Sequence, residues 1–505
     1  MTKLEQKEER EMRPPVVAIL GHIDHGKSTL LDYIRKTNVT EKEAGGITQH
    51  PSAYEVTRTP KSGRDQKITF IDTPGHEAFT SIRTRCASLA DVAVLVVSAE
   101  DGVKPQTLEV IKYIKECGLP FLVAITKIDK PSADTTRVKQ HLAENEIYVE
   151  GYGGNTPVVE LSAVTGKGVD DLLDMINLMA ELEGQIANRE ALGSGVIIES
   201  RLDSKRGITA VGIIKDGTVR CGLFAASSGT IAPIRFLLDA EGETVDELSF
   251  SSPVQIVGWD KMPDVGREFK TFLKKDEALA YAQSIKTQKT SATLSGKVSE
   301  NKEKIAFLPL VIKADTTGSL EVITNELERL ANDKIAPKII LSSIGNINEN
   351  DVKSALTTPG TVVIGFNTKA DSQALQLAER SNVEIFSFSI IYELTDKVRE
   401  LLSAKEPKIE VEEIEGSAKI LKIFNTDKGK QVVGGRVLTG QIKRNALTKI
   451  LRRDIEISRG KIKEIQQAKI ATDSVGEGTE FGAMIESKIE IAPGDVLQVV
   501  TLVTK

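Results

Sequence analysis

The sequence predicts a protein of several domains in which α/β domains alternate with β-barrels. The first observation is length, because 505 residues at roughly 100–200 residues per domain indicate three or four domains. The second is that short β-branched strands alternate with helix-length segments in residues 15–185 and again in 305–390. The third is that strand runs separated by turn signals fill residues 190–270 and 412–505.

The first domain is expected at residues 15–185, after a short charged N-terminal tail at 1–14. Its strands at 15–20, 67–72, 92–97 and 121–126 are nearly continuous apolar runs bounded by Gly, Pro or Asp. Such strands are typical of a parallel sheet that is covered by helices on both faces.

The remaining elements follow in chain order. Residues 190–270 predict an antiparallel β-barrel, 271–304 a helix with a polar linker, 305–390 an α/β/α sandwich, 391–411 a long connecting helix, and 412–505 a C-terminal β-barrel. Residues 212–222 align without gaps on residues 435–445, and both segments look like a strand, a glycine-containing turn and a second strand. That similarity suggests related hairpins in the two barrels.

Composition excludes several classes of protein. No stretch approaches the roughly 20 apolar residues of a transmembrane helix, and the charged N-terminus has no apolar segment of a secretory signal. The three cysteines, Cys86, Cys117 and Cys221, cannot form a disulfide scaffold or a CxxC zinc site. Aromatic residues are only 4% of the chain, too few to read nucleic acid mainly by base stacking. We therefore expect a cytoplasmic protein.

Charge is unevenly distributed along the chain. The net charge is −6, yet residues 416–505 hold 16 basic against 10 acidic side chains. An acidic body with one basic terminal domain fits local contact with a polyanion. The alternative is a solvated face of a β-domain.

Residues 21–28, GHIDHGKS, satisfy the phosphate-loop pattern G-x-x-x-x-G-K-[ST] between an apolar strand and a helix. Backbone N–H groups of such a loop point at a polyphosphate, while Lys27 would reach the β- and γ-phosphates and Ser28 would bind Mg²⁺. The candidate phosphate-binding residues are Gly21, His22, Ile23, Asp24, His25, Gly26, Lys27, Ser28 and Thr29.

Three later segments indicate GTP or GDP rather than an adenine nucleotide. DTPGH begins at Asp72, which could hold Mg²⁺, and Gly75 could meet a γ-phosphate. In TKID, the Asp129 carboxylate could accept both guanine donors, and the loop SAVTG offers backbone N–H groups to guanine O6. The candidates here are Asp72, Thr73, Pro74, Gly75, His76, Thr126, Lys127, Ile128, Asp129, Ser162, Ala163 and Val164.

His76 is the candidate catalytic residue. It directly follows Pro74 and Gly75, so its ring could orient a water in line with the γ-phosphate. A lone histidine is more often structural, and the water-orienting role rests mostly on the resemblance described next.

The motifs GHIDHGKS, EAGGITQHPSAY (43–54), DTPGHEAF (72–79) and DGVKPQT (101–107) resemble the GTPase domain of bacterial translation initiation factor two. The resemblance extends through 193–207, 311–321, 342–352 and the C-terminal barrel. It implies a ribosome-activated GTPase that brings formylmethionyl initiator tRNA to the small ribosomal subunit and promotes joining of the large one. Other initiation factors would be further partners, and no oligomerisation segment is evident, so we expect a monomer.

The resemblance also assigns roles to residues. Thr48 would close on Mg²⁺ beside Ser28 and Asp72, and His76 would orient the water. Residues of the terminal barrel would bind the initiator tRNA; the candidates are Gly435, Arg436, Lys443, Arg444, Arg452, Arg453, Lys461, Phe481 and Gly482.

Three positions depart from the family pattern. Thr126 stands where the guanine motif normally has Asn, and it lacks the amide that reaches guanine N7 and the phosphate loop. Gly435 and Phe481 stand where many relatives have cysteines that line the formylmethionyl pocket. The long charged N-terminal region common in the family is not seen.

Other functions remain open on sequence grounds. One is a GTP-binding, ribosome-associated protein with weak or no hydrolysis, which Thr126 would explain. Another is a different translational GTPase that delivers a tRNA, although such a protein would lack the 305–390 domain. A phosphate-loop kinase would show an acceptor pocket and no nucleobase motifs.

Overall fold

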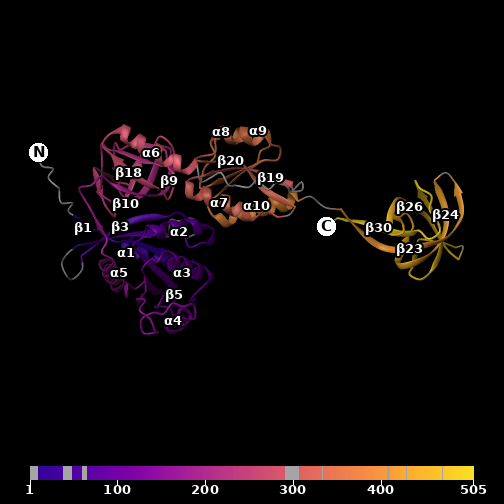
Figure 1. Ribbon diagram of the computed structural model, residues 1–505, viewed down its shortest axis with the longest axis horizontal. Helices are drawn as coiled ribbons and strands as arrows, with labels where there is room; N and C mark the ends of the chain where they lie inside the picture. The colour runs from indigo at the N-terminus through magenta and orange to yellow at the C-terminus, as the bar shows by residue number, and fades with distance from the viewer. Residues whose placement is uncertain are drawn as a thin grey trace. The chain divides into compact units, whose positions relative to one another are not determined.

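The computed structural model describes residues 10–37, 48–59, 65–290, 306–332, 334–406, 410–427, 429–468 and 470–504 (Figure 1). The chain forms two compact units, residues 1–405 and 406–505. The first contains two α/β domains with a β-domain between them, and the second is a closed barrel, which confirms the predicted fold class. No helix within the described ranges is long and apolar enough to cross a membrane.

The first domain is a six-stranded sheet in the order β3-β4-β2-β5-β6-β7, parallel except for β3 against β4. Its strands are β2 (Val16–Gly21), β3 (Ser52–Arg58), β4 (Gln66–Asp72), β5 (Val92–Ser98), β6 (Phe121–Thr126) and β7 (Val158–Glu160). Its helices are α1 (Lys27–Arg35), the short 3-10 helix η3 (Glu77–Phe79), α2 (Thr80–Leu89), α3 (Pro105–Cys117), α4 (Thr135–Glu144) and α5 (Val169–Glu183).

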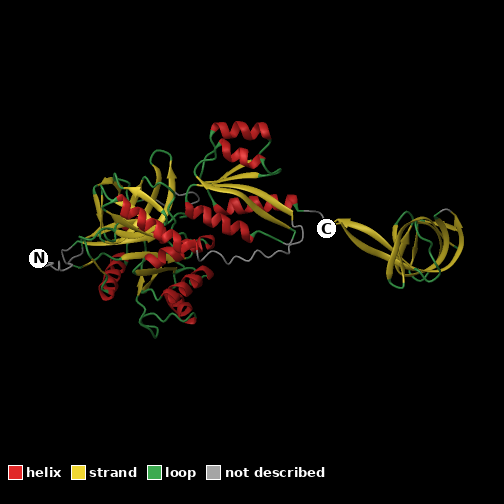
Figure 2. Ribbon diagram, turned by 45° about the horizontal axis from the view of Figure 1, so that its top comes forward, coloured by secondary structure: helices red, strands yellow, loops and turns green. Residues whose placement is uncertain are grey.

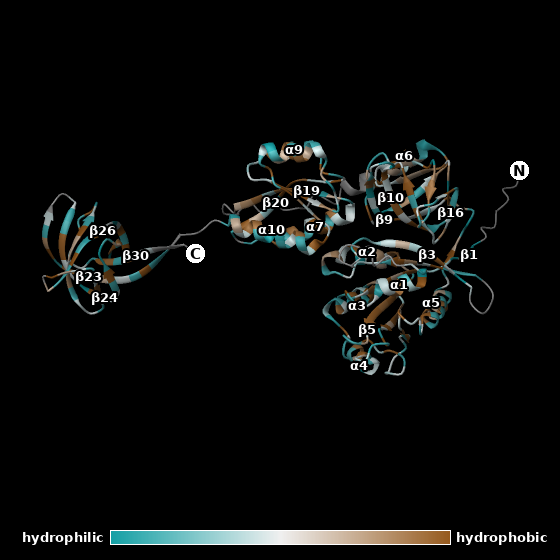
Figure 3. Ribbon diagram, turned by 180° about the vertical axis from the view of Figure 1, so that it is seen from behind, coloured by the Kyte–Doolittle hydropathy of each residue, from teal (hydrophilic) through white to brown (hydrophobic). Residues whose placement is uncertain are grey.

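Both faces of this sheet are covered, as the apolar strands predict. Helices α1 and α5 contribute to the hydrophobic cluster on one face, and α2, α3 and α4 to the cluster on the other. Every residue of β5 is buried, and the strand is coloured as hydrophobic in Figure 3. The loops that carry the candidate motifs leave the carboxyl ends of β2, β4 and β6, where open α/β sheets bind ligands.

Part of the predicted N-terminal tail is structured. Residues 1–9 lie outside the described residues, but β1 (Glu11–Met12) pairs with β8 (Ile186–Ala187). The Arg13 guanidinium is buried and donates two hydrogen bonds to Asp91, at 2.5 and 2.7 Å. A tail ending at residue 14 is therefore wrong, because Arg13 neutralises a buried carboxylate of the first domain.

The second domain is an eight-stranded antiparallel sheet in the order β13-β12-β18-β9-β10-β17-β14-β15, with β11 and β16 as a separate pair. One hydrophobic cluster collects side chains from both ends of that order, so the sheet curls around a single core. Helix α6 (Lys275–Thr290) packs on β12 and β13. The strands are β9 (Ser194–Asp203), β10 (Gly207–Asp216), β11 (Thr218–Arg220), β12 (Phe224–Ser227), β13 (Thr230–Pro233), β14 (Leu237–Leu238), β15 (Thr244–Val245), β16 (Glu247–Ser249), β17 (Pro253–Val257) and β18 (Glu268–Phe272). Of the predicted helix and polar linker at 271–304, residues 291–304 lie outside the described residues.

The third domain is an α/β/α sandwich, visible in Figure 2 as helices on both sides of a sheet. The parallel strands run in the order β20-β19-β21-β22, with α7 and α10 against one face and α8 and α9 against the other. Its elements are β19 (Ala306–Ala314), α7 (Thr317–Arg329), β20 (Ile335–Ile344), α8 (Glu349–Leu356), β21 (Val362–Phe366), α9 (Ser372–Ser381), β22 (Ile385–Phe388) and α10 (Ile391–Lys405).

Helix α10 differs from the predicted connecting helix at 391–411. It ends at Lys405, and β23 begins at Glu410, because proline at 407 cannot continue a helix. Its apolar stripe, including Leu394 and Val398, is buried in the core of the third domain. The helix is therefore an integral layer of that domain over its whole length.

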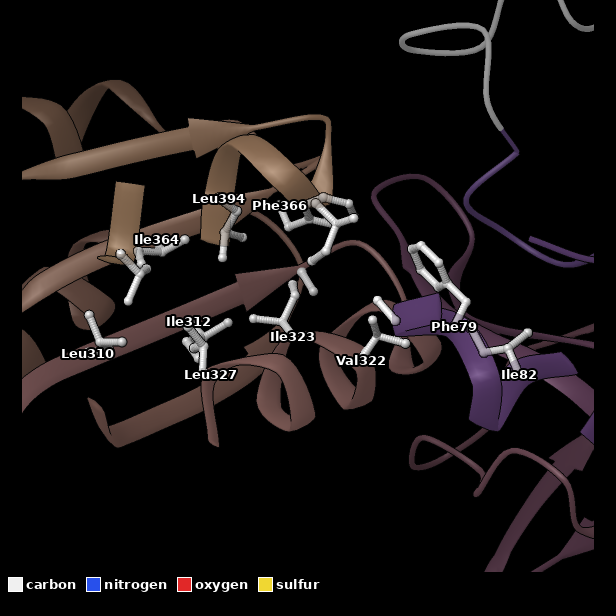
Figure 4. Close-up of a cluster of buried hydrophobic side chains, with 14 of the residues drawn as sticks. Phe79, Ile82, Leu310, Ile312, Val322, Ile323, Leu327, Ile364, Phe366 and Leu394 are labelled. Atoms are coloured by element: carbon white, nitrogen blue, oxygen red, sulfur yellow. The ribbon is translucent and has the colours of Figure 1, made fainter. Parts of the chain in front are cut away.

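One hydrophobic cluster joins the domains of the first unit. Phe79 of η3 and Ile82 of α2 pack with Val322 and Ile323 of α7 (Figure 4). The short segment that follows the DTPGH motif is therefore anchored in the core of the third domain.

The terminal unit is a closed six-stranded antiparallel barrel in the order β23-β30-β25-β26-β29-β24, where β24 also pairs with β23. Strand β23 pairs with β30 from Glu410 to Lys419, but it meets β24 only from Gly416 onward. The strands are β23 (Glu410–Asp427), β24 (Lys430–Lys443), β25 (Leu447–Arg452), β26 (Ile455–Gln467), β27 (Ile470–Thr472), β28 (Ser474–Gly476), β29 (Glu480–Ser487) and β30 (Val496–Thr504).

Candidate nucleotide-binding site

The phosphate loop lies between the end of β2 at Gly21 and the start of α1 at Lys27. Gly26 has a positive φ of 83°, and a Cβ on Gly21 would lie 2.4 Å from the Val96 carbonyl oxygen, so the sequence places glycine where another residue would be strained. Lys27 Nζ donates to the carbonyls of Gly21 at 3.0 Å and His22 at 2.6 Å. Burial lowers the pKa of Lys27 to about 8, although Asp72 opposes that shift. The phosphate loop thus encloses the ammonium group of Lys27 with its own carbonyls.

Three oxygen ligands converge beside this loop from segments far apart in sequence. Thr48 Oγ1 lies 2.8 Å from Ser28 Oγ and 3.4 Å from Asp72 Oδ2. Two hydroxyls and a carboxylate form a hard, all-oxygen donor set, which fits Mg²⁺. The preceding residues of the EAGGITQ motif, 43–47, lie outside the described residues.

His76 caps η3 with its ring. Its Nδ1 accepts a hydrogen bond from the Ala78 N–H at 2.8 Å. Burial, with the charge of Arg83, lowers the pKa of His76 to about 4, so the ring is neutral at pH 7. A neutral imidazole whose Nδ1 accepts must carry its proton on Nε2. His76 can therefore donate a hydrogen bond from Nε2 but cannot take a proton there.

Arg83 was not found by sequence reasoning, yet it shapes the DTPGH turn. Its buried guanidinium donates to the carbonyls of Pro74 and His76 and pairs with Glu109 at 3.1 Å. An arginine seven residues after the candidate histidine was the available signal.

The guanine-motif residues meet at the ends of β6 and β7. Thr126 is buried, and its Oγ1 donates to the His25 carbonyl at 2.6 Å. The expectation that threonine loses the link to the phosphate loop is therefore wrong, because the hydroxyl supplies that link. Asp129 is exposed, and a hydrogen bond from Ser162 lowers the pKa of its carboxyl, which keeps it ionised.

The remaining predicted residues surround these groups. Thr73 Oγ1 donates to the Ile19 carbonyl at 2.7 Å, and Lys127 adopts a positive φ of 61°. Val164 is exposed, whereas Ala163 and Ile128 pack against the domain's core clusters. Asp24 and Thr29 are exposed.

Two histidines of the loop are neutral for physical reasons. Burial lowers the pKa of His25 to about 4, and burial also lowers the pKa of His22.

The side chain of Gln106, which sequence reasoning did not select, accepts from the Ile23 N–H at 3.4 Å and so ties the DGVKPQT segment to the loop. Across the described ranges, no cluster of three His, Cys, Asp or Glu side chains could hold a metal.

The two residues after Thr48 contact the third domain. Gln49 Nε2 donates to the Ser389 carbonyl at 2.7 Å, and its Oε1 accepts from the Ile391 N–H at 3.3 Å. His50 lies 3.1 Å from Asp315 and 3.6 Å from Glu199. Burial opposes a charge on His50, but those two carboxylates raise its pKa to about 10, so the ring is an imidazolium.

The predicted tRNA-binding residues form two groups in the terminal barrel. Gly435 and Phe481 face each other on β24 and β29, and a Cβ on Gly435 would lie 2.9 Å from the buried phenyl ring. Gly482 pairs with Gly434 in the same register. Of the basic side chains, Lys443 pairs with Glu415 at 2.8 Å and Arg452 with Asp495 at 2.9 Å. The other predicted residues lie on the barrel itself. Arg436 donates to the Gly478 carbonyl, and Arg444 lies 3.9 Å from Asp473. Lys461 on β26 is opposite Glu486 on β29, and Arg453 occupies the β25–β26 turn.

Three family models match successive parts of the chain. Residues 12–181 match the elongation factor Tu GTP binding domain, and residues 193–272 match elongation factor G domain 2. Residues 282–399 match translation-initiation factor 2. The chain therefore resembles translation factors that carry a GTP-binding domain.

Individual proteins are similar to almost the whole of this chain. Translation initiation factor IF-2 of Phenylobacterium zucineum is 41% identical over 496 residues, which cover 96% of this chain and 49% of that protein. The IF-2 of Nitratiruptor sp. is 42% identical over 97% of this chain and 58% of that protein. A crystal structure of GDP-bound aIF5B from Aeropyrum pernix is 27% identical, covers 97% of this chain and 92% of that one, and has a TM-score of 0.44. The chain is similar to translation initiation factors IF-2 over almost all of its own residues, and it spans about half the length of the curated relatives it matches.

Proposed function

We propose that this protein is a ribosome-activated GTPase that acts in translation initiation in the cytoplasm. It binds formylmethionyl initiator tRNA, places it on the small ribosomal subunit and promotes joining of the large subunit, with GTP hydrolysis as the release switch. Other initiation factors are further partners, and the protein acts as a monomer. The observation that carries the proposal is the convergence of Ser28, Thr48 and Asp72 beside the Lys27 loop, since these residues come from three separate segments.

The site residues divide the work of binding and hydrolysis. Lys27 and the loop N–H groups hold the phosphates, and Asp129 selects guanine because a carboxylate accepts from both of its Watson–Crick donors. Ser28, Thr48 and Asp72 would hold Mg²⁺, which neutralises phosphate charge when bound. His76 donates from Nε2 to orient the attacking water, because its Nδ1 is occupied by Ala78.

The terminal barrel binds the initiator tRNA in this proposal. Basic side chains such as Arg436, Arg444, Arg453 and Lys461 contact its phosphates, so binding depends on salt. Because the Phe481 ring is buried in the barrel core, we assign it to shaping the wall behind Gly435 rather than to direct contact with the ligand.

The test is nucleotide hydrolysis by purified protein, with GTP or ATP, with and without 70S ribosomes, beside a His76→Ala control. We expect the protein to hydrolyse GTP but not ATP, and ribosomes to stimulate this hydrolysis. His76→Ala should abolish hydrolysis while GTP binding persists. Equal use of ATP would refute the guanine assignment. Failure of ribosomes to stimulate hydrolysis would refute the activation.

The second candidate function is a GTP-binding, ribosome-associated protein with weak or no hydrolysis. It is favoured by one observation, the burial of the His76 ring with Nε2 hydrogen-bonded to no described side chain or backbone group. GTP binding without ribosome-stimulated phosphate release would establish this alternative.

A further inference from the structure

The third domain reaches into the candidate catalytic site through the start of α10. The ring of Tyr392, the second residue of that helix, lies 4.0 Å from the ring of His76, centroid to centroid, with the planes at 50°. Phe79 meets the same imidazole edge-on at 5.9 Å. His76 is therefore enclosed by two aromatic side chains, one from its own domain and one from another.

Enclosure matters because of which ring atom is free to act. Nδ1 is occupied by the Ala78 N–H, so only Nε2–H can meet a water or a phosphate oxygen. That atom is covered by protein and has no hydrogen-bond partner among the described residues. A buried donor without a protein partner is unfavourable, so Nε2–H is suited to an acceptor that comes from outside the protein.

A second contact fixes the same part of α10. Gln49 uses both ends of its amide, one on the Ser389 carbonyl and the other on the Ile391 N–H. Gln49 is buried and adjoins Thr48, the candidate Mg²⁺ ligand. Residues 389–392 are thus held from both sides of the phosphate site, by Gln49 and by His76.

Tyr392 is placed where a partner could move it away from His76. It is 47% exposed, whereas His76 is 8% exposed, so the outer face of the tyrosine remains accessible to a partner. The rest of His76 is fixed by its own domain, since its backbone carbonyl accepts from the buried Arg83 and its Nδ1 accepts from the Ala78 N–H.

We propose that Tyr392 is a positioning residue that holds His76 away from the attacking water, and that Gln49 secures the segment carrying Tyr392. This inference rests on the hydrolytic function proposed above and adds that the third domain restrains catalysis. Movement of the start of α10 frees Nε2. A surface that displaces Tyr392 therefore activates hydrolysis without supplying a catalytic group.

The first test needs no activity. Titration of the histidine rings by NMR is practical because the chain has only five histidines, and His76→Ala assigns the signal. In Tyr392→Ala the pKa of His76 should rise from about 4 toward its ordinary value of 6.5, because the ring loses its cover. Tyr392→Phe, which keeps the ring, should leave the titration unchanged. If His76 still titrates near 4 in Tyr392→Ala, Tyr392 does not cover the ring and the proposal is overturned.

The second test measures GTP hydrolysis without ribosomes. Loss of an aromatic pair of this kind should change the fraction of molecules with a released His76 by roughly 2- to 13-fold. Tyr392→Ala should therefore raise the hydrolysis rate by that factor, and Tyr392→Phe should not. Gln49→Ala should raise it as well. In the double variant His76→Ala/Tyr392→Ala the gain should vanish, and a gain that survives, or no gain in Tyr392→Ala, overturns the proposal.

The two tests separate the proposals. If no variant hydrolyses GTP with or without ribosomes, the proposed function fails, while the titration still reports whether Tyr392 covers His76. If ribosomes stimulate the parent protein and Tyr392→Ala is no faster without them, the function stands and the restraint fails. A Tyr392→Ala protein with an unchanged melting temperature excludes general unfolding as the cause of any difference.

Discussion

The hydroxyl of Thr126 makes a quantitative prediction about nucleotide affinity. Thr126→Val removes one buried hydrogen bond, the 2.6 Å contact to the His25 carbonyl, and leaves that carbonyl unpaired. An unpaired buried polar group costs about 1–3 kcal/mol. We expect bound nucleotide to need the loop geometry that this contact holds. The cost should therefore appear in binding, as a loss of GTP and GDP affinity of about 5- to 150-fold.

The assay is equilibrium binding of a fluorescent guanine nucleotide, with displacement by unlabelled GTP, GDP and ATP. Thr126→Ser is the matched control, because it retains the hydroxyl, and its affinity should stay near that of the parent. Guanine selectivity should be unchanged in both variants, since Asp129 is untouched. An affinity of Thr126→Val within twofold of the parent, at an unchanged melting temperature, would refute the idea that this hydroxyl replaces the usual asparagine link.

Three further predictions concern separate parts of the molecule. Asp129→Asn removes charge-assisted hydrogen bonds, so GTP affinity should fall at least about tenfold in the same assay while xanthosine triphosphate improves; a change below threefold contradicts the assignment. Burial raises the pKa of Asp91, but hydrogen bonds from Arg13 outweigh it and the net pKa is lowered, so this carboxylate stabilises the fold above about pH 4 and less as pH falls. The urea midpoint of Arg13→Ala should therefore lie furthest below the parent at neutral pH and approach it near pH 3, and a pH-independent difference would count against this pairing. Arg453→Gln should reduce the salt slope of initiator-tRNA binding by about one, whereas Arg452→Gln, already paired with a buried carboxylate, should change it less; equal effects argue against phosphate contact by Arg453.

Much of the candidate site could be predicted from sequence because its groups lie in contiguous motifs. A glycine-rich loop between a strand and a helix has few possible geometries, and the ends of parallel strands meet at one edge of a sheet. The contribution of Thr48 was predicted from the resemblance to a known family and not from spacing. What spacing could not show was contact between distant segments, such as Gln49 with Ser389 and His76 with Tyr392.

Thr126 shows a different limit of sequence reasoning. Comparison with the family pattern treats a missing amide as a lost interaction. The structure shows that a shorter side chain makes the phosphate-loop contact with a hydroxyl, because the His25 carbonyl lies 2.6 Å away. Residue type alone does not determine which partner lies within reach.

Residues 212–222 and 435–445 share a backbone feature, but they do not form the related hairpins that their similarity predicts. In each segment the strand bends at a glycine of positive φ, Gly217 at 75° and Gly440 at 66°, and then takes a new partner. Residues 218–220 pair with β16 and residues 441–443 with β28, so neither glycine turns the chain back on itself. A glycine signals a left-handed backbone, but the sequence does not say whether the chain reverses there or changes sheets.

The long pairing of β23 with β30 places Glu410 opposite Thr504. The first and last strands of the barrel therefore have these two ends side by side, at the same end of the barrel. Proteins with adjacent termini tolerate circular permutation, so joining these ends through a short linker and opening the ring at another turn should preserve the barrel. For the same reason, a fluorophore attached at Thr504 would sit beside Glu410, and it would report on this end of the barrel rather than on the far end.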